Sequence, residues 1–287
     1  MPIALCARCR IYTWRRDYGE REDCLTEGCY HPPLVLDVIV IAAAAFAAGV
    51  INSIAGGGTL LSFPALVWIG RSVVLANATN TVAIWPGSLA GVIGFRREIA
   101  SLDRWLFLLT IPALLGGITG AVLLLRTPEK TFARIVPLLI LGATILLAAQ
   151  EAIAKRIPMF AAAHEKRTRG SIAFAFAFQF LVSVYGGYFG AGMGILMLAA
   201  LGLIGLRDLH QMNGLKNLLA ICINGVAAIY FAFSHAVVWR DAGIMAFTSI
   251  IGGYAGARLA RRLGRRFVRG FVIAIGLTMT VALAIRH

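Results

Sequence analysis

The sequence is poor in charge, and especially in acidic residues. Only 14% of its 287 residues are charged, against about 25% in an ordinary globular domain. The 13 acidic residues lie in the amino-terminal tail, in loops or near segment ends, and Asp37, Glu151 and Asp241 come nearest to the apolar runs. A cation pathway or proton relay built from buried carboxylates is therefore excluded, whereas coupling to protons or sodium through backbone carbonyl groups is left open.

Patterns that carry enzymatic chemistry are also missing. The five histidines, at positions 31, 164, 210, 235 and 287, show no metal-ligand spacing such as His-x3-His. No nucleophile–base arrangement and no Walker-type phosphate loop occur. We therefore expect neither an enzyme nor ATP-driven pumping by this chain alone, and we expect no cofactor.

The formal net charge of +14 could suggest a nucleic-acid partner. Lys and Arg, however, cluster in short loops between apolar stretches, which is typical of a membrane topology signal. We expect no nucleic acid, and instead the lipid bilayer and a small anion as partners; a homodimer is left open.

Apolar runs of about 20 residues, the length that spans a bilayer core, recur along the chain. They predict an all-α integral membrane protein with ten segments: 34–54, 59–70, 72–95, 104–125 and 131–153, then 170–187, 194–206, 208–234, 241–260 and 267–285. The chain thus divides into a first membrane repeat (34–153), a basic linker (154–169) and a second membrane repeat (170–287). Segments 59–70 and 194–206 are too short to span about 30 Å alone, so they either recruit flanking residues or re-enter.

Residues 1–33 form a polar tail with four of the five cysteines and no apolar run. The spacing Cys6-x2-Cys9-x14-Cys24-x4-Cys29 loosely resembles a zinc ribbon. A disordered tail, an oxidised cysteine pair, or an upstream start outside the working protein are the alternatives, and we assign no metal site. The fifth cysteine, Cys222, is most simply a packing residue.

The two halves of the chain match at a constant offset of 136 residues. The register aligns three groups of residues: the glycines Gly56 and Gly58 with Gly192 and Gly194; Asn77 and Asn80 with Asn213 and Lys216; and the run from Gly116 to Gly120 with that from Gly252 to Gly256. An ungapped register through three motifs indicates a real duplication.

Each repeat holds five segments, an odd number, so the second copy should be inverted relative to the first. Charge supports this orientation. With both termini outside, 15 Lys and Arg lie in or beside the inner loops and 5 in or beside the outer loops, as the positive-inside rule requires. The sequence therefore predicts two inverted five-segment repeats with short broken helices, although the five arginines of the tail oppose this orientation.

The most informative segments precede the two short helices. In these segments the chain is expected to leave a helix. Their candidate site residues are Asn52, Gly56, Gly57 and Gly58 in the first repeat, and Gly186, Gly187, Gly190, Gly192 and Gly194 in the second. Glycine lets the backbone approach a ligand, and the following helix amino terminus attracts an anion. Such paired breaks point to a transporter binding site. Close packing through small residues is the alternative, and it accounts well for Gly116, Gly117 and Gly120.

Polar residues on the third segment of each repeat complete the candidate site. They are Asn77, Thr81, Asn213, Lys216 and Asn217. Lys216 is the only Lys or Arg outside the loops and the tail, and a charge within a membrane segment indicates function; snorkelling to the interface is its alternative explanation. Pro86 predicts a kink in segment 72–95.

The stretch from Asn52 to Pro64, followed by Ala76 to Thr81, resembles the first repeat of the sulfite exporter TauE/SafE family. The runs from Gly186 to Gly194 and from Asn213 to Asn217 resemble its second repeat, and the similarity covers about residues 36–285. The resemblance implies a multi-pass permease of the bacterial inner membrane for sulfite, organosulfur compounds or other small anions. Met193 and Ala199 depart from the pattern in the second repeat.

We therefore expect a secondary carrier, working by alternating access, that exports a small anion bound between the two glycine breaks. A non-transporting membrane scaffold that recruits a partner is the alternative.

Overall fold

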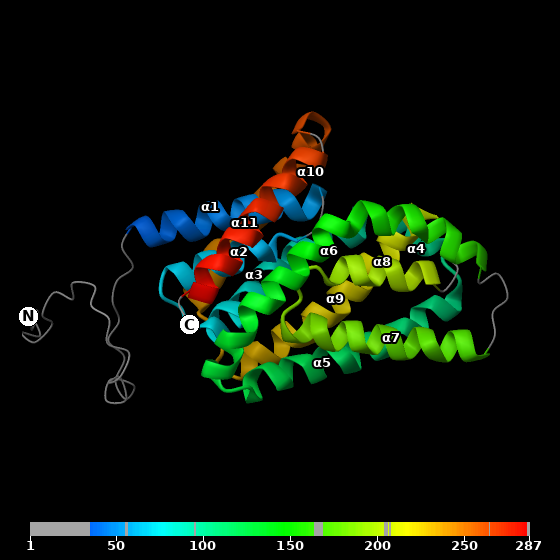
Figure 1. Ribbon diagram of the computed structural model, residues 1–287, viewed down its shortest axis with the longest axis horizontal. Coiled ribbons are helices and arrows are strands. Elements are labelled where there is room, and N and C mark those ends of the chain that lie inside the picture. The colour runs from blue at the N-terminus through cyan, green and yellow to red at the C-terminus, as the bar shows by residue number, and fades with distance from the viewer. Residues whose placement is uncertain are drawn as a thin grey trace, which may run out of the picture. The chain divides into compact units, whose positions relative to one another are not determined.

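The computed structural model describes residues 35–54, 57–94, 96–163, 169–203, 206, 208–263 and 265–285. In these ranges every regular element is a helix, and the elements from Val35 onward belong to one unit (Figure 1). The cysteine-rich tail and Gly56 lie outside the described residues. In chain order the helices are α1 (Val35–Ile54), α2 (Thr59–Trp68), α3 (Val73–Gly94), α4 (Arg96–Ala100), the 3₁₀ helix η1 (Arg104–Leu109), α5 (Thr110–Arg126), α6 (Glu129–Ala163), α7 (Arg169–Tyr188), α8 (Met193–Leu203), α9 (Leu209–Phe233), α10 (Trp239–Leu263) and α11 (Arg265–Ile285).

The predicted class, an all-α integral membrane protein, is confirmed. Among the described residues four helices are long and apolar enough to cross a bilayer: Val35–Asn52, Arg104–Arg126, Glu129–Ala149 and Gln211–Phe233. The two segments expected to be short are short, since α2 has 10 residues and α8 has 11.

Several helices extend beyond the predicted apolar segments. Helix α6 continues past residue 153 to Ala163, well into the basic linker, and α4 forms directly after α3. Residues 261–263 belong to α10 and residues 265–266 to α11, so most of the expected loop is helical. Ala, Lys and Arg are good helix formers, so a charged residue ends the apolar run without ending the helix.

Helices of the first half of the chain pack on helices of the second half. Helix α1 of the first repeat packs most extensively on α10 of the second, and reciprocally α5 packs on α7 (Figure 1). Helices α3 and α9, which are counterparts in the two repeats, pack on each other, and so do α6 and α11. A two-fold relation between the halves would produce this pairing.

Glycines allow the close crossings of these pairs. A Cβ atom on Gly116 or Gly120 would collide with the backbone of α7, and one on Gly117 with the backbone of α9. On the other side, a Cβ atom on Gly252 of α10 would collide with the carbonyl group of Phe46 in α1. The packing role predicted for Gly116, Gly117 and Gly120 is confirmed.

One hydrogen bond joins two positions that the predicted duplication aligns. The indole nitrogen of Trp85 in α3 donates a hydrogen bond to the carbonyl oxygen of Ile221 in α9, over 3.3 Å and a sequence separation of 136 residues. That separation equals the repeat offset, so Trp85 contacts its own counterpart.

Candidate functional site

The first break lies between α1 and α2 and is closed by a side chain. Asn52 Oδ1 accepts a hydrogen bond from the Gly58 N–H over 2.8 Å. The N–H groups of Leu60, Leu61 and Ser62 donate to the carbonyl groups of Gly57 and Gly58. Gly57 has a φ of 91°, a left-handed conformation that glycine adopts without strain. Asn52 therefore caps the start of α2, and most N–H groups there already have protein partners.

The second break lies between α7 and α8. Helix α7 ends at Tyr188, and the chain turns through Gly190 (φ 76°) and Gly192 (φ 75°) before α8 starts. The Tyr185 hydroxyl donates to the Ala191 carbonyl group, and Asn77 Nδ2 of α3 donates to the Tyr188 carbonyl group over 2.9 Å. Side chains of both repeats thus hold the non-helical backbone.

Both breaks contact α6. A Cβ atom on Gly57 would lie 3.8 Å from Leu147 Cδ2, and one on Gly192 would lie 3.4 Å from Ala143 Cα. Ala143 and Leu147 are four residues apart on one helix, a rise of about 6 Å. The two breaks therefore contact α6 at positions one helical turn apart.

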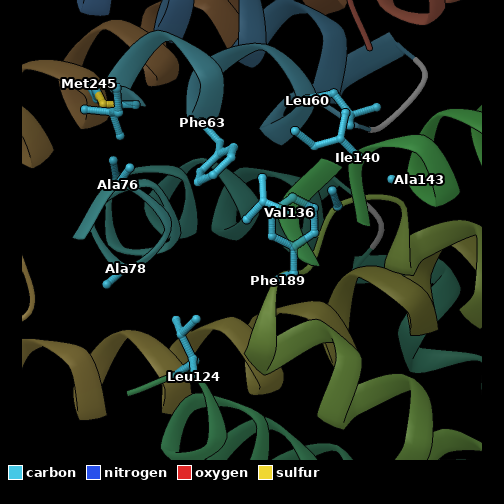
Figure 2. Close-up of a cluster of buried hydrophobic side chains, with 14 of the residues drawn as sticks. Leu60, Phe63, Ala76, Ala78, Leu124, Val136, Ile140, Ala143, Phe189 and Met245 are labelled. Atoms are coloured by element: carbon cyan, nitrogen blue, oxygen red, sulfur yellow. The ribbon is translucent and has the colours of Figure 1, made fainter. Parts of the chain in front are cut away.

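An apolar core fixes the second break against the first repeat. The ring of Phe189, inside the break, packs edge-on against Phe63 of α2 with centroids 5.4 Å apart, and Phe132 of α6 contacts both Phe189 and Tyr188. Figure 2 shows Phe63 and Phe189 with the α6 residues Val136 and Ile140. The break is thus supported by a fully packed surface.

Lys216 of α9 lies over the start of α8. A Cβ atom on Gly194 would be 3.3 Å from the Lys216 Cδ, so the absence of a side chain at Gly194 makes room for the lysine stem. Lys216 Nζ donates to Asn213 Oδ1 over 3.0 Å. The structure therefore brings Gly194, Asn213 and Lys216 together at a helix amino terminus.

The remaining predicted site residues have weaker links to the breaks. Thr81 donates to the carbonyl group of Asn77 within α3 over 2.9 Å. Asn217 is half-buried on α9, and in the described part of the chain no hydrogen bond joins either residue to a break.

The sequence did not identify every residue that shapes the site. Ser62 Oγ donates to Asn80 Oδ1 over 2.6 Å and so joins α2 to α3; a hydroxyl group in an apolar segment was the available signal. Tyr188 contributes through its main-chain carbonyl group, which no residue type reveals. Ala143 and Leu147 are ordinary apolar residues of α6.

The charges described at the start of α8 are positive. The start of α8 carries the partial positive charge of a helix amino terminus, and the Lys216 ammonium group lies beside it. In the described ranges no group of three His, Cys, Asp or Glu side chains could hold a metal ion. Membrane-length helices interrupted by two glycine breaks are the architecture of a multi-pass membrane transporter.

The chain belongs to the sulfite exporter TauE/SafE family, whose sequence pattern it matches over residues 41–283. It is 29% identical over 255 residues to "Probable membrane transporter protein YfcA" of Escherichia coli K12, covering 88% of this chain and 90% of that protein. It is 26% identical to a "Probable membrane transporter protein" of Haemophilus influenzae, covering 82% and 89%. No solved structure matches the chain.

Proposed function

We propose that this transporter exports a small anion, such as sulfite or an organosulfonate, across the bacterial inner membrane without chemical conversion. The contact between the Lys216 stem and Gly194, at the start of α8, carries the proposal. It places a lysine of a membrane-length helix at the helix end that attracts negative charge.

The anion site is proposed to be asymmetric. N–H groups at both helix starts already have protein partners, Gly58 at α2 and Met193 and Ile195 at α8. The difference is that, at α2, no basic side chain occupies the position equivalent to Lys216. At α8 the ammonium group adds a full charge, bonded to Asn213. The α8 end is therefore the binding end, and the α2 end is the neutral counterpart that shapes the passage.

Export is the favoured direction on energetic grounds. The cell interior is negative, so each negative charge that leaves gains about 2.3 kcal/mol per 100 mV. An anion exporter consequently needs no buried carboxylate for proton coupling, in keeping with the scarcity of acidic residues in the membrane segments.

Flux measurements with the full-length protein in proteoliposomes test the proposal. We expect radiolabelled sulfite, or one of a panel of organosulfonates, to move down an imposed membrane potential. Lys216→Met should reduce the flux at least about tenfold, the effect of losing one charge-assisted hydrogen bond. Lys130→Met, at an exposed lysine of α6, should leave it unchanged.

Two results would contradict the proposal in different ways. If Lys216→Met transports as well as the unmodified protein, the site is wrong. If no anion of the panel moves at all, transport of sulfur anions is wrong and the scaffold alternative gains support.

A further inference from the structure

A buried oxygen atom at the second break lacks the partner that its chemistry requires. The Asn77 side chain is 1% exposed, and its Oδ1 accepts no hydrogen bond from any described residue. Leaving a buried acceptor unpaired costs about 1–3 kcal/mol. A bound cation or a hydrogen-bond donor would satisfy this oxygen atom.

Exchanging the oxygen and nitrogen positions of the Asn77 amide group would not remove the unpaired atom. Asn77 Nδ2 donates to the Tyr188 carbonyl oxygen, which can only accept, so the nitrogen must face it. Gln179 differs: its Oε1 is also unpaired, but its neighbour is the Ser183 hydroxyl group, which can donate as well as accept. The unpaired oxygen of Asn77 is thus a property of the structure and not of an amide assignment.

The second repeat shows what kind of partner fits this position. The counterpart of Asn77 is Asn213, whose Oδ1 accepts from the ammonium group of Lys216, three residues farther along α9. In the first repeat Asn80 occupies the position of Lys216 and is bonded to Ser62. In the second repeat, therefore, the asparagine is bonded to the positive charge of a lysine. In the first repeat the equivalent asparagine has no lysine at the matching position.

We propose that a monovalent alkali cation binds Asn77 Oδ1 and takes the place of the missing ammonium group. The site lies where α7 ends, and a helix carboxyl terminus attracts positive charge. Non-helical carbonyl groups at such breaks are known ligands of transported ions. No carboxylate is needed, because neutral oxygen atoms and the helix dipole stabilise a single positive charge.

This cation would lie close to the proposed anion. Tyr188, the last residue of α7, is at the cation end, and Gly194, in the first turn of α8, is at the anion end; they are six residues apart across one break. Opposite charges at the two ends of the break stabilise each other, so the cation should strengthen anion binding. That coupling depends on the proposed function, whereas cation binding itself does not.

Equilibrium binding of radioactive sodium to the purified full-length protein, with choline chloride keeping the ionic strength constant, tests the site. We expect saturable binding that unlabelled Na⁺ displaces. Asn77→Leu should weaken it about ten- to hundredfold, the effect of one hydrogen bond or ion contact to a charged group. Asn224→Leu, at a half-buried asparagine of α9 outside the site, should bind as the unmodified protein does.

Two further variants separate loss of the site from loss of folding. Asn77→Asp adds a negative charge at the same oxygen and should bind Na⁺ more tightly, a gain that misfolding cannot produce. Asn80→Lys places an ammonium group three residues from Asn77, as in the second repeat, and should abolish Na⁺ binding in protein that elutes as one species. Absence of saturable binding, or equal binding by Asn77→Leu, overturns the inference.

The outcomes also separate this inference from the proposed function. Na⁺ binding without any anion flux would overturn anion transport and leave the cation site standing. Anion flux without Na⁺ binding would do the reverse.

Discussion

At the scale of single residues, the ion pair between Arg71 and Asp241 joins the two repeats. Arg71 Nε donates to Asp241 Oδ2 over 2.7 Å, and the side chains are 35% and 2% exposed. Arg71→Leu should destabilise the protein by about 2 kcal/mol, because a buried carboxylate loses its partner. Asp241→Asn should cost less, since the exposed part of Arg71 stays hydrated. Thermal unfolding in detergent would rank the two variants.

A double variant checks the cause of this effect. If the loss comes from the stranded carboxylate, Arg71→Leu combined with Asp241→Leu should be more stable than Arg71→Leu alone. A double variant that is as unstable as the sum of its parts would show that the two residues act independently.

Residue identity predicted part of the site. Gly57, Gly190 and Gly192 adopt left-handed conformations, and Lys216 reaches a helix start, as unusual residues in apolar segments suggested. The partner of Asn77 was not predictable, because the acceptor is a main-chain carbonyl group that any residue possesses. Nor did the residue type of Asn52 show that it would cap its own break.

At the scale of elements, α10 offers a matched pair of glycines to test close packing. A Cβ atom on Gly252 would meet the α1 backbone at Phe46, whereas one on Gly243 would meet nothing within 4 Å. Gly252→Ala should therefore destabilise the protein by about 1–3 kcal/mol through overpacking. Gly243→Ala should be neutral or stabilising by up to about 1 kcal/mol, since alanine favours a helix.

The unfolding midpoints of the two variants provide the measurement. Equal midpoints would show that α1 and α10 can separate without cost, and would contradict the role of the glycine crossing.

Helix order and the two breaks followed from apolar runs and glycine, but the helix ends did not. Hydrophobicity marks where a helix can contact lipid, whereas backbone hydrogen bonding continues as long as the residues tolerate it. Residues 154–163 illustrate this difference, since Lys155 and Arg156 suggest the start of a linker and the whole stretch still belongs to α6.

At the scale of the whole molecule, contacts between connections agree with the charge count. Arg71, after α2, contacts Asp241 at the start of α10, and both connections are expected outside. Gln211, at the start of α9, donates to Ser101 in the connection after α4, and both are expected inside. Each of these two contacts therefore joins connections that the charge count assigns to the same side of the membrane. No single sequence segment could show this sorting, because each contact joins residues more than 100 positions apart.

The inversion of the repeats predicts opposite accessibility for two equivalent connections. Ser101 follows the third helix of the first repeat, and Ser234 follows the third helix of the second; both are exposed. Ser101 is bonded to Gln211 at the start of α9, whereas Ser234 follows its end. With 25 residues, α9 is about 37 Å long, so the two serines lie at opposite ends of a membrane-length helix.

Cysteine labelling in intact cells tests this arrangement, in a background where the five native cysteines are replaced by serine. Ser234→Cys should react with a membrane-impermeant maleimide added outside, and Ser101→Cys should react only after the membrane is broken. Parallel repeats would expose both cysteines on one side, and that result would contradict the predicted inversion. Opposite labelling would place the Asn77 and Lys216 ends of the site in oppositely oriented halves, the geometry that alternating access requires.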